Sequence, residues 1–210
     1  GMLLALAMNT KIRGVALYRT AFFMPNITTT VAVCIVWSWL YNKDYGLFNN
    51  LLKMVGLEPI KWISSKKMAM PSVAIMSVWQ AMGYDMILLT AGLKGISETY
   101  YEAAKIDGAS RFKRVLCVDF PAISGTVSVL LILAIGGLLA SGDEKALLMQ
   151  TEANLETSEI LATYVYKRGL TGYTQPGYAT AIGLFSSVIN VVLLGFANFL
   201  AKKFSANTLW

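Results

Sequence analysis

Long apolar segments alternate with short polar stretches along the chain. Four segments, 21–41, 71–93, 122–140 and 178–201, approach the length of about 20 mostly apolar residues that a helix needs to cross a bilayer. Aromatic residues lie near several of their ends, as at Trp37, Trp39, Trp62 and Tyr178, where an apolar ring with a polar tip anchors a helix at the membrane interface. The pattern predicts an all-α, polytopic membrane protein.

Two shorter apolar segments have a different meaning. Residues 2–8 are far too few to cross a bilayer, and they are typical of the end of a span that begins upstream. No charged n-region precedes them, so a signal peptide is not expected. Residues 47–55 are amphipathic, and we expect them to form a helix along the outer membrane interface.

Composition agrees with the membrane class and excludes several functions. Apolar residues make up 56% of the 210 residues and charged residues only 14%, whereas soluble domains carry about 25% charged residues. The net charge is +6, but the basic residues flank apolar segments and form no run interleaved with aromatics, so we expect no nucleic-acid partner.

Candidate catalytic chemistry is sparse. The sequence has no histidine, and Cys34 and Cys117 make neither a disulfide framework nor a metal-ligand pattern. No phosphate-binding loop of the form Gly-x-x-x-x-Gly-Lys-Ser/Thr occurs, so any ATP that drives transport is hydrolysed by another chain. We therefore expect no catalytic residues, no metal site and no cofactor.

The distribution of basic residues predicts the orientation in the membrane. Ten of the eighteen lysines and arginines, including four of the five arginines, lie in 9–20, 94–121 and the segment after residue 201. Cytoplasmic loops carry an excess of basic residues. These segments are therefore expected in the cytoplasm, with 42–70 and the acid-rich 141–177 outside.

The loop 94–121 is the most informative polar stretch, with the sequence KGISETYYEAAKIDGASRFKRVLCVDFP. Ser97 is placed to cap a helix, and Gly108 is suited to the left-handed turn that ends one. A second short helix is expected over 109–118, with Pro121 ending it and restarting the chain into the third span. A rigid helix-turn-helix on the cytoplasmic face, with small residues that allow close approach, predicts a docking site for a partner protein.

The spacing within this loop resembles the signature of binding-protein-dependent ABC importer permeases. That signature reads Glu-Ala-Ala, three residues, Gly, nine residues and Ile-x-Leu-Pro, and a longer form adds an Asp and an Ala beside the Gly. The matching residues are Glu102, Ala103, Ala104, Asp107, Gly108, Ala109 and Pro121, with conservative departures at Val118 and Phe120. The resemblance implies that the loop sits in a cleft of an ATPase subunit and couples its closure to the membrane helices.

Most of the chain resembles the carbohydrate branch of this family. Similar segments occur at 19–25, 45–49, 79–84 and 163–166, and the tail with Ser205, Leu209 and Trp210 looks most like oligosaccharide or polysaccharide permeases. Two departures stand out: the chain has four spans and a fraction where six core helices are expected, and 150–154 replaces a Gly-Gly-Pro turn. We therefore expect a single permease domain over 1–210, an N-terminally incomplete helical core of a type I importer.

The resemblance also implies partners and a location. The chain would sit in the lipid bilayer of a bacterial inner membrane and pair with a second permease subunit. Two cytoplasmic ATPase subunits would power the pair, and an extracytoplasmic solute-binding protein would deliver a sugar substrate. The chain itself would perform no covalent chemistry.

Polar residues inside the spans are candidates for the substrate pathway. Asp85 lies near the middle of the second span, where a carboxylate is costly unless it is paired or hydrated. Gln80 and Tyr84 are four residues apart on the same helix, as are Ser186 and Asn190 on the last span. The alternative for Asp85 is a polar contact to a neighbouring helix or subunit, and for the last pair it is an interhelical hydrogen bond.

Other functions stay open on sequence alone. A permease for another small solute, such as glycerol phosphate or a peptide, would share the same features. A membrane enzyme would need a catalytic constellation, but Asp85 has no histidine or second carboxylate beside it in the spans. A structural membrane protein would leave the fixed spacing of the 94–121 loop unexplained.

Overall fold

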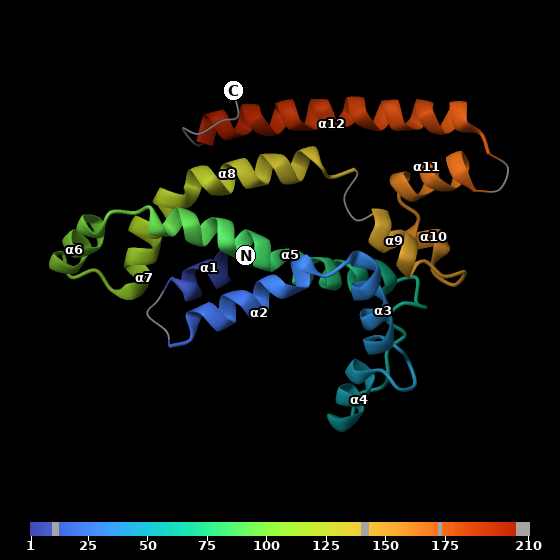
Figure 1. Cartoon of the computed structure of the whole chain (residues 1–210), viewed down its shortest axis with the longest axis horizontal. Coiled ribbons are helices and arrows are strands. Elements are labelled where there is room, and N and C mark those ends of the chain that lie inside the picture. Colours follow the sequence, from blue (N-terminus) through green and yellow to red (C-terminus); the bar gives the residue numbers. More distant parts are fainter. Residues whose placement is uncertain (10–12, 140–142, 172–173, 205–210) are drawn as a thin grey trace. The chain divides into compact units, whose positions relative to one another are not determined.

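The computed structural model describes residues 1–9, 13–139, 143–171 and 174–204 (Figure 1). Lys11, Ser141, Ser205, Leu209 and Trp210 lie outside the described residues. Within the described ranges the chain is built from α-helices and one π-helical turn, without strands. The all-α prediction is confirmed.

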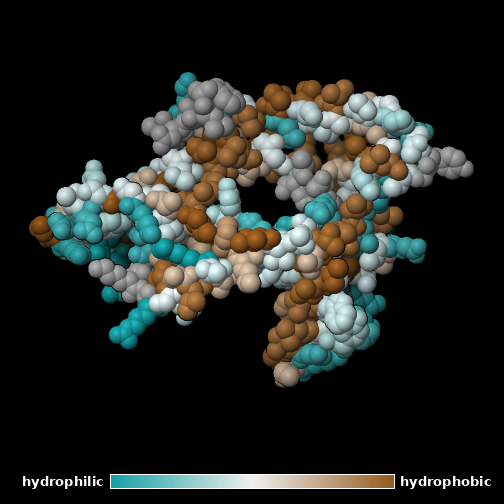
Figure 2. All heavy atoms as spheres, viewed as in Figure 1, coloured by the Kyte–Doolittle hydropathy of each residue, from teal (hydrophilic) through white to brown (hydrophobic). Residues whose placement is uncertain are grey.

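Among the residues that the structure describes, three helices are long and apolar enough to cross a membrane. They are α5 (Ala69–Lys94), the continuous helix that runs from Arg111 to Gly136, and α12 (Pro176–Phe204). The predicted segments 71–93 and 178–201 fall inside α5 and α12. Figure 2 shows brown, apolar atoms over much of α12, as expected of a helix that faces lipid or a partner subunit.

The segment 21–41 is divided between two helices rather than forming one straight span. These are α2 (Val15–Ile27) and α3 (Thr30–Leu40), bent by 101° at the break. Thr29 has an extended backbone there, with φ −58° and ψ 141°, and consecutive β-branched threonines are poor helix formers. Counting the bent pair as one span gives four in all.

The predicted stop at Pro121 is wrong, because the helix continues through it. The second helix of the loop comprises α7 (Arg111–Arg114) and a π-helical turn, η1 (Val115–Asp119), and leads directly into α8 (Phe120–Gly136). Pro121 lies in the first turn of α8, where its missing N–H leaves no carbonyl of that helix unpaired. The π-turn directly before it takes up the change in hydrogen-bond register.

The chain divides into two compact units. The first comprises 1–24, 81–138 and 189–210, and contains α1 (Met2–Met8), α6 (Glu98–Ile106) and α8. Its core packs Ala5 and Met8 of α1 against apolar side chains of α5 and Ile123 of α8. Gly83 lets α5 and α2 approach, because a Cβ there would lie 2.0 Å from the carbonyl oxygen of Phe22.

The second unit comprises 25–80 and 139–188. Besides α3 it contains α4 (Leu47–Met54), α9 (Asp143–Met149), α10 (Leu155–Ser158) and α11 (Leu161–Leu170). The α4 helix agrees with the amphipathic helix predicted at 47–55. The core of the second unit includes the aromatic rings of Trp37, Tyr41, Phe48 and Trp62, and the exposed Trp79 packs against Trp37 with ring centroids 5.4 Å apart.

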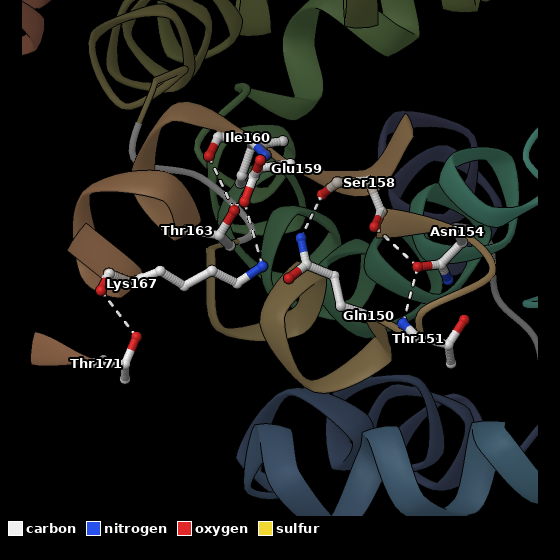
Figure 3. Close-up of polar contacts among 9 residues, drawn as sticks. All are labelled: Gln150, Thr151, Asn154, Ser158, Glu159, Ile160, Thr163, Lys167 and Thr171. Carbon is white, nitrogen blue, oxygen red and sulfur yellow. Dashed lines mark hydrogen bonds and ion pairs between the residues drawn. The ribbon is translucent and has the colours of Figure 1, made fainter. Parts of the chain in front are cut away.

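Two buried asparagines organise the polar stretches of the second unit. The Asn49 amide donates to the carbonyls of 42, 43 and 60, and its Oδ1 accepts from the backbone N–H of Ile60 and from Trp62 Nε1. Asn154 Oδ1 accepts from the Thr151 N–H at 2.8 Å and from Ser158 Oγ at 2.9 Å (Figure 3). Sequence reasoning missed both roles, because most of these partners are not determined by local spacing.

Candidate functional site

The turn that follows α6 has the backbone geometry predicted for it. Gly108 has a φ of +69°, in the left-handed region. Its N–H donates to the Lys105 carbonyl at 3.0 Å, and the Ala109 N–H donates to the Ala104 carbonyl at 2.9 Å. These two bonds form a Schellman motif, which satisfies carbonyls that the end of the helix would leave unpaired. At the other end, Ser97 Oγ accepts from the Thr99 N–H at 3.4 Å, so the predicted cap is present.

The signature residues present an accessible surface. Glu102, Ala103, Asp107 and Gly108 are exposed, Ala104 and Ala109 are half-buried, and Pro121 is exposed. No residue of α6 is buried. Figure 2 shows polar, teal atoms gathered over α6 and α7 at one end of the first unit.

Large apolar side chains also project from this region. Ile106 is 86% exposed and Phe112 is 74% exposed. Exposed apolar side chains of this size, surrounded by charged residues, are typical of a surface that another protein covers. The loop thus combines a fixed backbone, small residues that allow close approach, and large apolar side chains that the described part of the chain leaves exposed.

One polar contact ties α6 to the third span. Tyr101 Oη donates to Asp119 Oδ1 at 2.5 Å, and Asp119 is only 6% exposed. Burial and the neighbouring carboxylate raise the pKa of Tyr101 to about 12, because both disfavour the charged phenolate. Sequence reasoning missed this pair, since the direction of the Asp119 side chain depends on the π-turn.

A groove of about 560 Å³ lies beside Tyr101. Its walls carry charged side chains of both signs: Lys94, Glu98, Glu102, Lys105 and Arg114. Arg114 Nε is buried and has no hydrogen-bond partner among the described residues. Charged groups of both signs favour a partner surface of complementary charge and would hold that surface in one orientation.

The pathway candidates on α5 have different local surroundings. Gln80 is buried, and its Nε2 donates to the Thr28 carbonyl at 3.3 Å, next to the break between α2 and α3. Tyr84 is half exposed, and Asp85 is half-buried against the backbone of Gly1. The predicted role of these residues in a pathway stays a prediction.

The two candidates on α12, Ser186 and Asn190, also differ in their hydrogen bonding. Ser186 Oγ donates to the Ile182 carbonyl of its own helix at 2.8 Å, which is a common arrangement for serine within a helix. Asn190 Oδ1 is buried and lacks a hydrogen-bond partner in the part of the chain that the structure describes. Among the described residues, no group of three or more His, Cys, Asp and Glu is placed to hold a metal ion.

Comparison with known proteins agrees with the signature of the loop. The family model described as "Binding-protein-dependent transport system inner membrane component" matches residues 1–206. Protein LplB of Bacillus subtilis is 35% identical over 211 residues, covering 100% of this chain and 66% of its own length. The polygalacturonan/rhamnogalacturonan transport system permease protein YteP of the same organism is 35% identical over 207 residues, covering 97% of this chain and 64% of its own.

The fold is also that of a solved importer. The crystal structure of a bacterial ABC transporter involved in the import of the acidic polysaccharide alginate superposes with a TM-score of 0.91 at 28% identity, covering 97% of this chain and 71% of that one. A second crystal structure of the alginate transporter, in complex with an alginate pentasaccharide-bound periplasmic protein, gives a TM-score of 0.89 at 27% identity, covering 99% and 72%.

The chain spans about two thirds of the length of the curated relatives it matches. The family match nevertheless covers nearly all of it and includes the whole loop between α5 and α8. The chain therefore belongs to the family of inner membrane components of binding-protein-dependent transport systems.

Proposed function

We propose that the chain is a permease subunit of an ATP-driven oligosaccharide importer. The observation that carries the proposal is the 94–121 loop, in which Glu102, Ala103 and Ala104 lie on an exposed helix that is ended by the left-handed Gly108. A protein that only spans the membrane has no need for a rigid loop that exposes large apolar side chains in this way. A permease driven by a separate ATPase does need one, because mechanical coupling requires a stiff contact.

The loop residues have distinct parts in this proposal. The Glu102 carboxylate, on exposed α6, would orient this helix against the ATPase subunit by charge. Ala103 and Ala104 would allow the backbone of the ATPase subunit to approach closely. Gly108 fixes the direction of the turn, and the apolar side chains of Ile106 and Phe112 would be covered on docking. Asp107, Ala109 and Pro121 complete the signature and belong to the same docking surface.

The substrate class rests on the relatives. YteP is named for polygalacturonan and rhamnogalacturonan transport, and the solved importer takes up alginate. We infer that this chain handles a saccharide longer than a single sugar, delivered by an extracytoplasmic binding protein to a pathway shared with a second permease subunit. A permease for glycerol phosphate or a peptide is not favoured by these relatives.

Within that pathway, polar side chains of α5 and α12 are the candidates. Gln80, Tyr84 and Asp85 would offer an amide, a ring and a carboxylate to sugar hydroxyls and ring faces. Asn190 has a buried acceptor available for a partner, whereas the Ser186 hydroxyl already bonds to its own helix.

Co-purification tests the docking surface directly. The complete transporter is expressed with an affinity tag on this chain, and the amount of ATPase subunit recovered is measured. We expect ATPase subunits with the wild-type chain and few with Ala103→Arg, because a long charged side chain on the exposed face of α6 prevents close approach.

The matched control is Asn50→Arg on α4, a position that is also exposed but lies in a stretch predicted to face outside. It should recover ATPase subunits at the wild-type level. Equal recovery with Ala103→Arg and Asn50→Arg would contradict the assigned docking surface.

A further inference from the structure

The α6 helix has few contacts of its own with the start of α8. No residue of α6 is buried. It is joined to α5 by residues 95–97 and to α7 by the turn at Gly108, whose two hydrogen bonds fix the local backbone. Neither connection ties the body of α6 to the start of α8, so a further contact is needed if a displacement of α6 is to reach that helix directly.

Tyr101 supplies that contact. Among the described residues it is the α6 side chain that hydrogen-bonds to other helices, donating to Asp119 in η1 and lying within hydrogen-bonding range of Asn9 at the end of α1. The bond joins two residues that are 18 positions apart, so it closes a loop of the chain. Within that loop lie the turn at Gly108 and the whole of α7.

The chemistry of the pair favours a stiff contact. Asp119 is nearly inaccessible to water, and a buried carboxylate is costly unless a donor satisfies it. Oxygen–oxygen distances near 2.5 Å are typical of hydrogen bonds from a hydroxyl to a carboxylate, which are stronger than neutral ones. Since Asp119 immediately precedes α8, a displacement of Tyr101 is transmitted to the first residue of that helix.

We infer that the hydrogen bond between Tyr101 and Asp119 is the link that makes α6, α7 and the start of α8 move as one rigid body during transport. The inference rests on the proposed function. Tyr101 and Asp119 are positioning residues in this account: neither needs to touch the ATPase subunit or the saccharide. Losing the link should let hydrolysis continue while less of the motion reaches the membrane helices.

The test uses the complete transporter in proteoliposomes and measures uptake of saccharide per ATP hydrolysed. Tyr101→Phe removes only the hydroxyl and should lower that ratio by about tenfold, the equivalent of one hydrogen bond to a charged group. Tyr18→Phe, which removes the hydroxyl of an exposed tyrosine on α2 in the same unit, should leave the ratio unchanged.

Two further variants separate a link from a merely structural role. Asp119→Asn keeps an acceptor of the same size but forms a weaker, neutral bond, so it should give a smaller loss of the ratio. If Tyr101→Phe fails to assemble, the ratio is read from Asp119→Asn alone. The double variant should be no worse than Tyr101→Phe, because both changes remove the same interaction.

Three results are distinguishable. A normal ratio in Tyr101→Phe and Asp119→Asn, with the wild-type transporter active, overturns the link but not the proposed function. Uptake and hydrolysis per assembled transporter that fall in the same proportion in both variants also overturn the link, because the ratio is then unchanged. A wild-type complex that hydrolyses ATP without importing any saccharide overturns the proposed function itself.

Discussion

Replacing Gly108 by alanine tests the backbone conformation of the turn between α6 and α7, because the substitution adds only a methyl group. The residue has a φ of +69°, and a Cβ built there meets no atom within 4 Å. Steric overlap is therefore absent, and the cost is that of holding an L-residue in the left-handed region, about 1–2 kcal/mol. The two hydrogen bonds of the Schellman motif depend on this conformation, so the end of α6 should loosen.

Gly56 provides a closely matched control. It has a φ of +82°, it also meets no atom within 4 Å of a built Cβ, and it ends α4 with the same pair of bonds. Those bonds run from its own N–H to the Lys53 carbonyl at 3.1 Å and from the Leu57 N–H to the Leu52 carbonyl at 2.9 Å. The intrinsic backbone penalty of Gly56→Ala should therefore equal that of Gly108→Ala.

The assay compares uptake and substrate-stimulated ATP hydrolysis in proteoliposomes, each normalised to the amount of assembled complex. A penalty of one to two kcal/mol lowers the population of the native turn relative to its alternatives by about 5- to 30-fold. We expect Gly108→Ala to lose function on that order and Gly108→Val to lose more, because valine is β-branched. Gly56→Ala should retain function. Equal activities for the two alanine variants would refute the reasoning.

Four further outcomes are expected. Asp85→Leu should raise the KM of uptake while Asp85→Asn is tolerated, if the site is wet; unchanged uptake by the leucine variant would contradict a pathway role. Asn49→Ala leaves two N–H donors without their acceptor, and should lower the free energy of unfolding by about 1–3 kcal/mol or more, measured by thermal unfolding. A membrane-impermeant maleimide should label exposed Cys117 only from the cytoplasmic side and leave buried Cys34 unmodified; labelling of Cys117 in sealed, right-side-out vesicles would reverse the topology. The pKa of Tyr101 is raised from 10 to about 12, so its stabilising contribution is complete below pH 10 and is lost as the pH rises through 12; burial also raises the pKa of Tyr41 to about 12, so the ultraviolet tyrosinate titration of Tyr101→Phe should keep a late step but with a smaller amplitude than the wild type.

The features that sequence predicted are those decided locally. The lengths of α5 and α12 follow from long, mostly apolar runs, and the turn at Gly108 follows from the residue type that adopts its backbone most readily. The cap at Ser97 and the amphipathic α4 are local in the same sense. Fold class and the outline of the docking loop were therefore accessible without a structure.

The features that sequence missed depend on register or on distant partners. Proline was expected to end the second loop helix, but the π-turn before Pro121 allows the helix to continue, and no composition signal marks that turn. The π-turn in turn sets the direction of Asp119, so its pairing with Tyr101 was hidden as well. Asn154 binds a carbonyl 91 positions away, a contact that no local pattern encodes.

ATP-dependent accumulation of an oligosaccharide tests the central claim most directly. The complete transporter, containing this chain, is reconstituted into sealed proteoliposomes with its binding protein outside and ATP inside, and labelled saccharide in the lumen is measured over time. The account predicts accumulation above the external concentration with ATP and none with a non-hydrolysable analogue. Accumulation without ATP hydrolysis, or hydrolysis stimulated by the loaded binding protein with no saccharide entering the lumen, would contradict it.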